Sequence, residues 1–333
     1  MLGAFALDWQ VGRARMAIDR RGFLSMMGVA SVLGARLCAN AALNSEFDEN
    51  LSVFLSDIHV VGAGVSGKYS FTRKELDKRI DEILSIHPRP RRVVTFGDLA
   101  FNHGEKDSYE YARSAFKRLQ DIGIKVVHGL GNHDRRDAFL EVFPEFAKTT
   151  LVEGAIVHEV DLGACDLILF ESDNSGMKQI VQERFNEILA ARKRPFLAGS
   201  HHPSYLTTQK IKDVLLADAI RDYPLCAGWV HGHKHFWSNR ENMDKTRTRH
   251  FVRDLCLPSG GIQGDIGLVI LRTYPDRAVA TLHQKGFWYG VDLPTEDDVA
   301  PDKAEFTART VENDGQICTF SFARKNNTQK ERK

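Results

Sequence analysis

The sequence predicts an α/β protein whose central strands run largely parallel, and two observations carry this prediction. From residue 51 onward, a short apolar run, a polar cluster and a segment with helical periodicity follow one another repeatedly. Strands that alternate with helices are typical of sheets built from βαβ units. In addition, each polar cluster comes directly after an apolar run, and the carboxyl ends of parallel strands gather at one edge of a sheet. Segments far apart in the chain therefore point at a single place.

The expected strands of this sheet are the short apolar runs. In chain order they cover residues 51–55, 93–96, 124–127, 155–160, 166–170, 195–198 and 226–230. The first expected helix opens with a capping-box pattern, Thr72 to Glu75, and continues with apolar residues at helical spacing. A second helix is expected around 109–121 and closes at Gly123, and a third covers roughly 177–192.

The pattern changes after Phe236 to non-helical apolar runs, which predict strands of a second, partly antiparallel sheet. These runs lie at residues 250–257, 268–273 and 278–283. The charge-rich segment 239–249 is expected to be exposed to solvent, and the basic tail from residue 324 to be frayed. We therefore place the folded domain at residues 42–290 and a C-terminal extension at residues 291–333.

Residues 1–41 form a separate signal segment in this interpretation. Arg20 and Arg21 precede an apolar stretch at residues 22–35, and small residues follow at 39–41. This order is typical of an export signal with a cleavage site, and the paired arginines resemble the twin-arginine signal of bacteria. The apolar stretch has about 14 residues, fewer than the roughly 20 that cross a bilayer. We expect export to the periplasm or the outside of the cell, with no stable membrane insertion after cleavage.

The composition narrows the classes of partner. The chain has 333 residues and 43% hydrophobic content, which is enough for a well-buried core. Its net charge is +1, from 45 basic and 44 acidic residues. A balance so close to neutral predicts no broad attraction to nucleic acid or to an acidic membrane surface. A small-molecule ligand fits this balance better than a polyanion does.

The cysteines that follow the signal segment lie in apolar, strand-like runs without CxxC spacing. They are Cys165, Cys226, Cys256 and Cys318. Buried thiols are the expected state for cysteines in such surroundings, rather than a zinc site. An exported protein can also form disulfides, and the sequence leaves any pairing among the four open.

The polar clusters at the strand ends contain carboxylates, imidazoles and one amide. The candidate metal ligands are Asp57, His59, Asp98, Asn132, His201, His233 and His235. Oxygen and nitrogen donors without a thiolate suit Mn, Fe, Zn, Co or Ni rather than a structural cysteine-type zinc. Seven donors exceed what one tetrahedral ion takes, and they match two divalent ions about 3.5 to 4 Å apart that share a carboxylate.

The spacing inside these clusters also fits metal binding. In the DxH and HxH patterns one residue separates the two donors, so on an extended segment both side chains project on the same side. Glycines come directly before three of the ligands or ligand pairs, at Gly97, Gly131 and Gly232. A backbone without Cβ can turn sharply there and approach the ions closely.

The ordered set DxH, GD, GNHD, HxP and GHxH resembles the calcineurin-like metallophosphoesterase superfamily, over about residues 51–285. The resemblance implies a four-layer αββα sandwich of two mixed sheets flanked by helices, with two divalent ions at the strand ends. It also implies a ligand for each position. Asp57, His59 and His235 would hold the first ion, Asn132, His201 and His233 the second, and Asp98 would bridge them.

Hydrolysis of a phosphoester follows from such a centre. Two divalent ions lower the pKa of a shared water, so that hydroxide exists at neutral pH and attacks the phosphorus in line. His133 lies beside the ligand Asn132 and is placed to protonate the leaving oxygen, and Asp134 is expected to orient His133 and hold its charged form. For His231, ordinary packing is the favoured interpretation.

The sequence motifs specify the class of substrate only in part. Purple acid phosphatases carry a tyrosine ligand where this chain has Phe101, which has no oxygen donor, so that branch is disfavoured. The motifs around Asp98 and His133 are similar to those of class III cyclic nucleotide phosphodiesterases, and Arg135, Arg136 and His202 are candidate substrate residues. We expect a phosphodiesterase acting on a small molecule. The alternatives are a broad-specificity phosphomonoesterase and a non-catalytic metal-binding module.

Overall fold

A computed structural model describes residues 46–67, 69–241, 253–288 and 313–322. The signal segment expected at residues 1–41 lies outside these residues, as do most of the charged segment after residue 241 and the tail from residue 324. The chain divides into two compact units, Met1–Glu46 and Phe47–Lys333, and the second carries the elements described below. The described helices include none that is long and apolar enough to cross a membrane.

The first sheet has the strand order β14-β13-β12-β1-β2-β3. Its strands are β1 (Phe47–Leu55), β2 (Arg89–Phe96), β3 (Lys125–Gly129), β12 (Gly264–Tyr274), β13 (Arg277–Trp288) and β14 (Ile317–Ser321). The expected runs from 51, 93 and 124 form the parallel half, since β1 pairs with β2 and β2 with β3 in parallel. The strands β12, β13 and β14 extend the sheet on the other side of β1, and all of their pairings are antiparallel.

The second sheet has the order β10-β11-β9-β6-β5-β4. Its strands are β4 (His158–Asp161), β5 (Asp166–Phe170), β6 (Phe196–Ser200), β9 (Cys226–His231), β10 (Ser238–Glu241) and β11 (Arg253–Cys256). The central pairings of β5, β6, β9 and β11 are parallel, whereas β4 and β10 at the two edges are antiparallel. A two-stranded ribbon of β7 (Lys210–Ile211) and β8 (Val214–Leu215) lies apart from both sheets in the pairing scheme.

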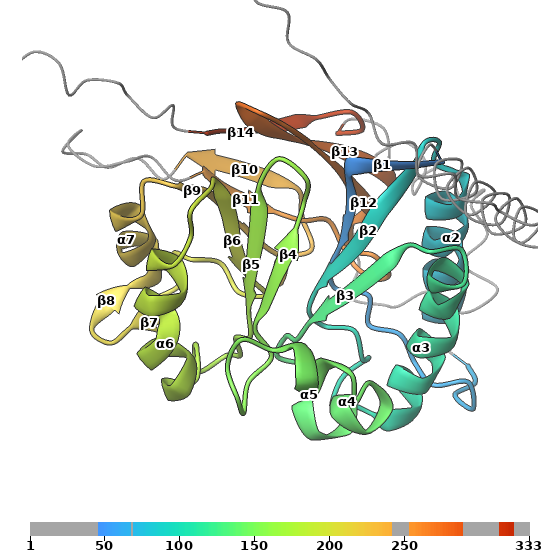
Figure 1. Ribbon diagram of the computed structural model, residues 1–333. Helices are drawn as coiled ribbons and strands as arrows, with labels where there is room; N and C mark the ends of the chain where they lie inside the picture. The colour runs from blue at the N-terminus through green and yellow to red at the C-terminus, as the bar shows by residue number, and fades with distance from the viewer. Residues whose placement is uncertain (1–45, 68, 242–252, 289–312, 323–333) are drawn as a thin grey trace, which may run out of the picture. The chain divides into compact units, whose positions relative to one another are not determined.

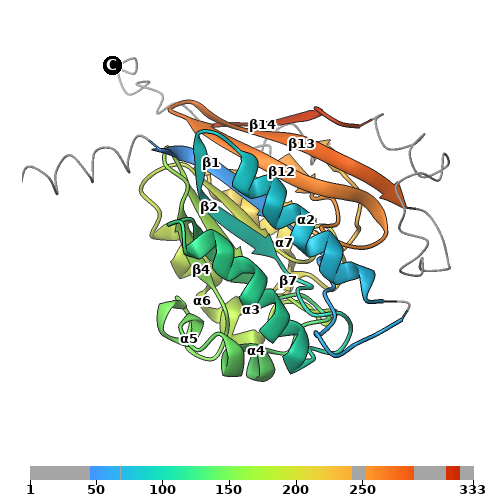
Figure 2. The ribbon, with the colours of Figure 1, turned by 90° about the vertical axis from the view of Figure 1, so that its right-hand side faces the viewer.

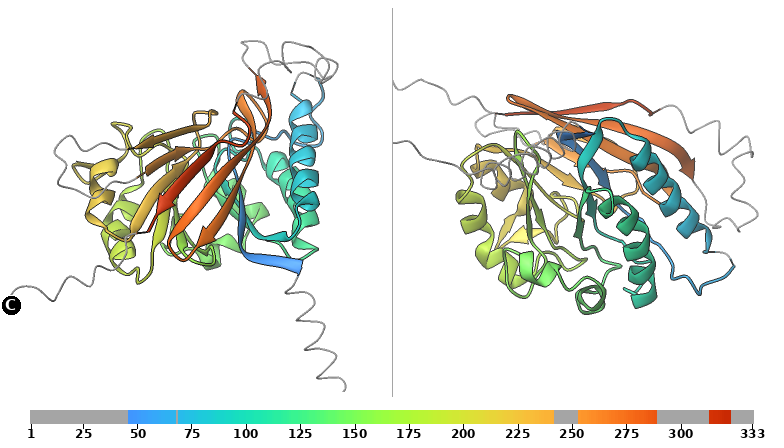
Figure 3. Two further views of the ribbon diagram at one scale, coloured as in Figure 1. Left: turned by 90° about the horizontal axis from the view of Figure 1, so that it is seen from above. Right: turned by 45° about the vertical axis from the view of Figure 1, so that its right-hand side comes forward.

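Helices cover the outer faces of the two sheets, as Figures 1 and 2 show. The helices are α2 (Phe71–Ser85), α3 (Lys106–Gln120), α4 (Arg136–Val142), α5 (Phe146–Thr149), α6 (Gln179–Ala190), α7 (Leu216–Ala219) and the 3-10 turn η1 (Ile220–Asp222). Of these, the short helices α4 and α5 lie at the lower end of the view in Figure 1. Helices α2 and α3 lie on the first sheet, and α6 and α7 on the second. Figure 3 (left), seen from above, shows the same succession of layers.

Three hydrophobic clusters fill the three interfaces between these layers. One joins α2 and α3 to the first sheet and includes Leu76, Ile80 and Phe116. A second lies between the sheets and includes Phe54, Phe96 and Leu169. The third joins the second sheet to α6 and α7 and includes Phe185 and Trp229. The predicted four-layer αββα sandwich is therefore confirmed.

Two expectations about the later strands are wrong. The runs from 268 and 278 join the first sheet, as β12 and β13, whereas only the run before 257 joins the second sheet, as β11. In addition, β14 pairs with β13, so part of the segment placed in a C-terminal extension belongs to the first sheet. Its burial alternates, with Cys318 and Phe320 buried and Ile317 exposed, but five residues after a long connection carry too little pattern to be found by periodicity.

The ends of two helices show how local chemistry decides a boundary. Thr72 does not cap α2, because the helix already begins at Phe71. Its hydroxyl instead donates to Tyr69 O and accepts the backbone N–H of Val61. At the end of α3 the prediction is confirmed, since Gly123 has φ +92 and its N–H bonds to Gln120 O. All four described cysteines are buried thiols outside any disulfide, as expected.

Two buried histidines in the core predict a loss of stability in mild acid. Burial lowers the pKa of His128 to about 3 and that of His158 to about 4. Because both values lie below 6.5, the unfolded chain binds more protons as the pH falls from 6.5 toward 3, so stability present above pH 6.5 is lost over that window. For His128 alone the loss at pH 5 is about 2 kcal/mol. Urea unfolding at pH 7 and pH 5 measures it, and His128→Gln should show a clearly smaller pH difference than the wild type. Equal differences in the two proteins would contradict this account.

Candidate metal centre

The seven predicted ligands all follow the carboxyl ends of strands, and these strands come from both sheets. Asp57 and His59 follow β1, Asp98 follows β2 and Asn132 follows β3. In the second sheet, the ligands after β6 and β9 are His201, His233 and His235. The two sheets therefore meet at one edge with these side chains between them, which is the arrangement that the parallel pairing predicts.

The backbone at this edge is held in an unusual conformation. Five of the seven predicted ligands have positive φ, between 48 and 69°: Asp57, His59, Asp98, His233 and His235. Left-handed backbone is uncommon for residues other than glycine and costs on the order of 1 to 3 kcal/mol at each position. Such strain persists only where the surroundings over-determine the geometry, so its concentration at these five donors marks a functional site.

Glycines beside the ligands leave room for this close approach. A Cβ on Gly131 would lie 2.3 Å from Asp98 Oδ1, and a Cβ on Gly232 would lie 2.5 Å from Asp57 Oδ2. Gly97 itself has φ +92, and a Cβ there would meet Gly131 N at 2.7 Å. These contacts explain why glycine precedes the ligands in the GD, GNHD and GHxH motifs.

The donors form two groups that share Asp98. In the first group, Asp57 Oδ1 lies 3.1 Å from His235 Nε2, and His59 Nε2 lies 3.6 Å from Asp98 Oδ2. The ligand atoms of Asp57, His59 and His235 all lie within 4.8 Å of one another.

In the second group, Asn132 Oδ1 lies 3.1 Å from His201 Nε2 and 3.0 Å from His233 Nδ1. His201 Nε2 is also 3.0 Å from Asp98 Oδ2. We refer to these as the first and the second donor group, with Asp98 between them.

Three of the four imidazoles are oriented by backbone carbonyls. The Nδ1 atoms of His59, His201 and His235 donate to Phe101 O, Phe96 O and Ile262 O at 2.9, 2.9 and 2.8 Å. A proton fixed on Nδ1 leaves the Nε2 lone pair directed at the centre, as in histidines that bind metals. His59 Nε2 is buried and has no hydrogen-bond partner among the described residues. A divalent ion held by these donors fits the residues present.

The charges of the site also match a cation. Burial would raise the pKa of Asp57 and Asp98, but the neighbouring histidines outweigh it and both carboxyls stay ionised. Burial lowers the pKa of His59 and of His233 to about 4, so both rings are neutral ligands at pH 7. At His201 burial is outweighed by Asp98, and its pKa rises to about 9. A proton on His201 thus supplies the positive charge that an ion would supply, and it must leave when an ion binds.

Comparison with known proteins agrees with this geometry. A model of the calcineurin-like phosphoesterase family matches residues 52–236, which is more than half of the chain. The chain belongs to this family. It is 28% identical over 174 residues to a probable cyclic nucleotide phosphodiesterase of Rhodopseudomonas palustris, a match that covers 49% of this chain and 61% of that protein. The match thus spans less than two thirds of the relative's length.

Solved structures show the same fold. A dimetal phosphatase from Danio rerio superposes with a TM-score of 0.57 at 12% identity, covering 82% of this chain and 99% of that one. A purple acid phosphatase from yellow lupin seeds superposes with a TM-score of 0.50 at 14% identity, covering 71% of this chain and 51% of that one. These likenesses show the fold, and the family to which the chain belongs is one that uses divalent metals.

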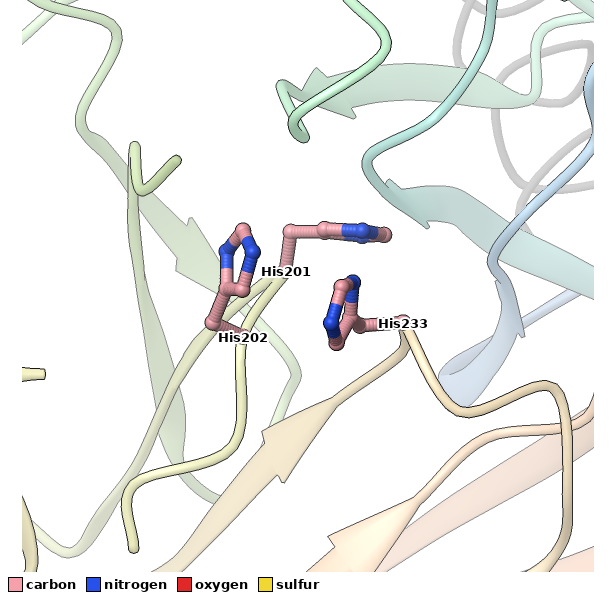
Figure 4. A group of neighbouring side chains, drawn as sticks. All are labelled: His201, His202 and His233. Atoms are coloured by element: carbon pink, nitrogen blue, oxygen red, sulfur yellow. The ribbon is translucent and has the colours of Figure 1, made fainter. Parts of the chain in front are cut away.

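A third histidine lies against the second donor group. Figure 4 shows His201 and His202, from consecutive positions after β6, beside the ring of His233. The His202 and His233 rings are 4.3 Å apart, and their nitrogens lie close enough to share an ion.

The hydrogen bonds of His202 argue against its being a ligand. Its Nδ1 faces Ser172 Oγ at 3.1 Å and its Nε2 faces Asn174 Oδ1 at 3.3 Å. An Nε2–H that donates to Asn174 and an Nδ1 that accepts from Ser172 leave no free lone pair. Burial, reinforced by His201 and His233, lowers its pKa to about 2, so the ring stays neutral. His202 is buried and packs its ring against that of His233. Its expected contact with substrate has no support in the structure.

The expected pairing of His133 with Asp134 is contradicted. The Asp134 carboxylate accepts the backbone N–H groups of Leu99, Ala100 and Gly131, at 3.0 to 3.2 Å, and the hydroxyl of Tyr109 at 3.1 Å. It therefore ties the loop after β2 to the loop after β3. His133 is oriented instead by a carbonyl, since its Nδ1 donates to Asn102 O at 2.9 Å, and its backbone N–H bonds to Asp98 Oδ1 at 2.8 Å.

The two arginines after this motif have different surroundings. Arg136 begins α4, and its guanidinium pairs with the buried carboxylate of Glu171, with Nη2 to Oε1 at 3.0 Å, and also bonds to Gly154 O. It is engaged in holding α4 against the end of β5, so its expected role on substrate is not supported. Arg135 is exposed beside Gly104 and remains a candidate for contacting substrate.

Several contributors to the site escape motif-based reasoning. The carbonyls of Phe101 and Asn102 orient His59 and His133, and a backbone carbonyl carries no signal in the sequence. Tyr109 bonds to Asp134 and Asp254 accepts from Ser204, so both contact loops that hold ligands, yet they lie on a helix and on a strand. For Asp254 a signal exists, because a carboxylate inside the apolar run FVRDLCL is unusual for a buried strand.

Proposed function

We propose that this phosphoesterase hydrolyses phosphodiesters with two divalent ions, one in each donor group. The observation that carries the proposal is the position of Asp98. Its Oδ2 lies 3.6 Å from His59 of the first donor group and 3.0 Å from His201 of the second. A carboxylate shared in this way is what a two-ion site requires. Asp57, His59 and His235 would hold one ion, and Asn132, His201 and His233 the other.

The chemistry needs a nucleophile and a proton for the leaving group. Ions bound here supply a water of lowered pKa and neutralise charge on the phosphate oxygens. His133 supplies the proton, because Asn102 O fixes Nδ1 and leaves Nε2 to carry a proton to the departing oxygen. The ring is partly exposed and lies 4.9 Å from the ring of His59, so it borders the metal centre without belonging to it.

The preference for a phosphodiester rests on three features. The relative from Rhodopseudomonas palustris is described as a probable cyclic nucleotide phosphodiesterase. Phe101, which stands at the position of the tyrosine ligand in purple acid phosphatases, packs its ring on Tyr69 at 4.6 Å and offers no oxygen to an ion. Arg135 is the exposed cation nearest to His133 in the chain and is suited to the second phosphate substituent or to a phosphate oxygen.

An assay with two chromogenic esters tests this proposal. Protein freed of metal by a chelator should be inactive, and adding back Mn²⁺ or Zn²⁺ should restore hydrolysis. The reloaded protein should cleave bis-p-nitrophenyl phosphate, and it should do so faster than p-nitrophenyl phosphate. Faster cleavage of the monoester would replace the proposal by a phosphomonoesterase. No cleavage of either ester by protein that holds two ions would indicate a non-catalytic metal-binding module.

A further inference from the structure

A buried pair, His231 and Asp254, lies directly behind the second donor group. His231 Nε2 is 2.8 Å from Asp254 Oδ1, and both residues are buried, with 0% and 4% of their surface exposed. Asp254 lies on β11, which pairs with β9 in parallel, and His231 is the last residue of β9. Neither residue reaches the donor atoms, so the proposed reaction makes no use of them.

The pair is connected on both sides to segments that carry ligands. On one side, Ser204 Oγ donates to Asp254 Oδ2 at 2.8 Å, and Ser204 belongs to the loop that begins with His201. On the other side, His231 Nδ1 donates to Gly232 O at 2.8 Å, directly before His233. The two loops also meet each other, because Gly232 N–H bonds to His201 O at 3.0 Å. One carboxylate therefore couples the loop of His201 to the loop of His233.

The position of Gly232 leaves little tolerance for movement. A Cβ at this glycine would lie 1.8 Å from Ser56 Oγ, so the loop passes very close to the loop after β1. The next backbone N–H, that of His233, donates to both carboxylate oxygens of Asp57 at 3.0 Å. The His231 ring holds Gly232 O in place. It thereby also fixes the direction in which the His233 side chain leaves the backbone.

Two histidines of the first donor group have anchors of their own. His235 Nδ1 bonds to Ile262 O, and His235 O accepts the backbone N–H of Asp265, so this ligand is anchored by the segment around the start of β12. His59 is anchored by Phe101 O. Loss of the buried pair therefore affects the two donor groups unequally.

We propose that Asp254 and His231 are positioning residues for the second ion, because together they hold His201 and His233 at the spacing that this ion requires. The inference rests on the proposed two-ion site. Contacts behind metal ligands typically change affinity by about 10- to 100-fold when they are removed. In Asp254→Ala we expect the affinity for the second ion to fall by at least about tenfold, and the affinity for the first ion to stay unchanged.

Metal binding tests this inference without reference to activity. Metal-free protein is titrated with Mn²⁺ or Zn²⁺, and bound metal is counted by elemental analysis after dialysis at a series of free concentrations. The wild type should bind two ions, and Asp254→Ala one ion with wild-type affinity and one weakly. Asp254→Asn should restore the second ion, because its amide oxygen can accept from His231 and its amide NH₂ can donate to Ser204 Oγ. Asp213→Ala, an exposed carboxylate on the β7–β8 turn, is the matched control and should bind two ions normally.

A double variant covers the case in which Asp254→Ala does not fold. Replacing both members of a buried charged pair with apolar residues is often neutral for stability, so Asp254→Leu combined with His231→Leu should fold and still lose the second ion. Two ions at wild-type affinity in either folded variant would overturn the inference, as would equal weakening of both ions. A wild type that binds a single ion would overturn the proposed function as well, which separates the two failures.

Discussion

Asp98→Asn is expected to lower the turnover of bis-p-nitrophenyl phosphate by on the order of 1,000-fold or more, because divalent ions contribute several kcal/mol to such reactions. The asparagine keeps the shape of the side chain and the acceptor for the backbone N–H of His133, which bonds to Asp98 Oδ1. It removes the negative charge shared by the two donor groups. We also expect fewer than two ions per protein chain after dialysis, which elemental analysis measures beside the rate.

The matched control is Asp276→Asn, which makes the same chemical change at an exposed turn between β12 and β13, where Asp276 pairs with Arg277. This variant should keep both the wild-type rate and the wild-type metal content. Thermal melting of the metal-free forms shows whether Asp98→Asn is folded. A folded Asp98→Asn protein that retains two ions and more than a tenth of the wild-type rate would rule out the bridging role.

His133→Gln is expected to lower hydrolysis by about 100- to 10,000-fold for an ester whose leaving group is an alkoxide, such as a nucleoside cyclic monophosphate, because that oxygen needs a proton as it departs. For bis-p-nitrophenyl phosphate the loss should be much smaller, since nitrophenolate leaves as an anion. The ratio of the two rates is therefore the informative quantity. Metal content should stay unchanged, because His133 lies outside both donor groups.

The matched control for this substitution is His87, an exposed histidine between α2 and β2. His87→Gln should leave both rates at the wild-type level. If His133→Gln slows the two esters by the same factor, His133 acts on binding or on the ions, and a different group must protonate the leaving oxygen.

The sequence predicts the ligand-bearing half of this fold well, for a physical reason. The parallel strands β1, β2, β3, β5, β6 and β9 are buried apolar runs, and each of the ligand motifs follows one of them within a few residues. A local pattern therefore reports both the strand and the place where its carboxyl end must lie. The same reasoning fails for β12, β13 and β14, because which sheet a strand joins depends on pairing with distant β1 and not on its own periodicity.

The site shows the same division between local and distant information. The seven donors can be found because DxH, GNHD and GHxH are short motifs with their own spacing. The expected partner of His133 was wrong because Asp134 is next to it in the chain, whereas the group that orients it, Asn102 O, lies 31 positions away and is a backbone atom. Likewise, the sequence suggests that Arg136 can contact substrate, but its guanidinium pairs with Glu171, which is distant in the chain at the end of β5.

The most direct test of the two-ion site is anomalous diffraction from crystals of the metal-loaded protein. We predict two peaks about 3.5 to 4 Å apart, one bounded by Asp57, His59 and His235 and the other by Asn132, His201 and His233, with Asp98 between them. A single peak, or two peaks of which one lies away from Asp98, would contradict the account.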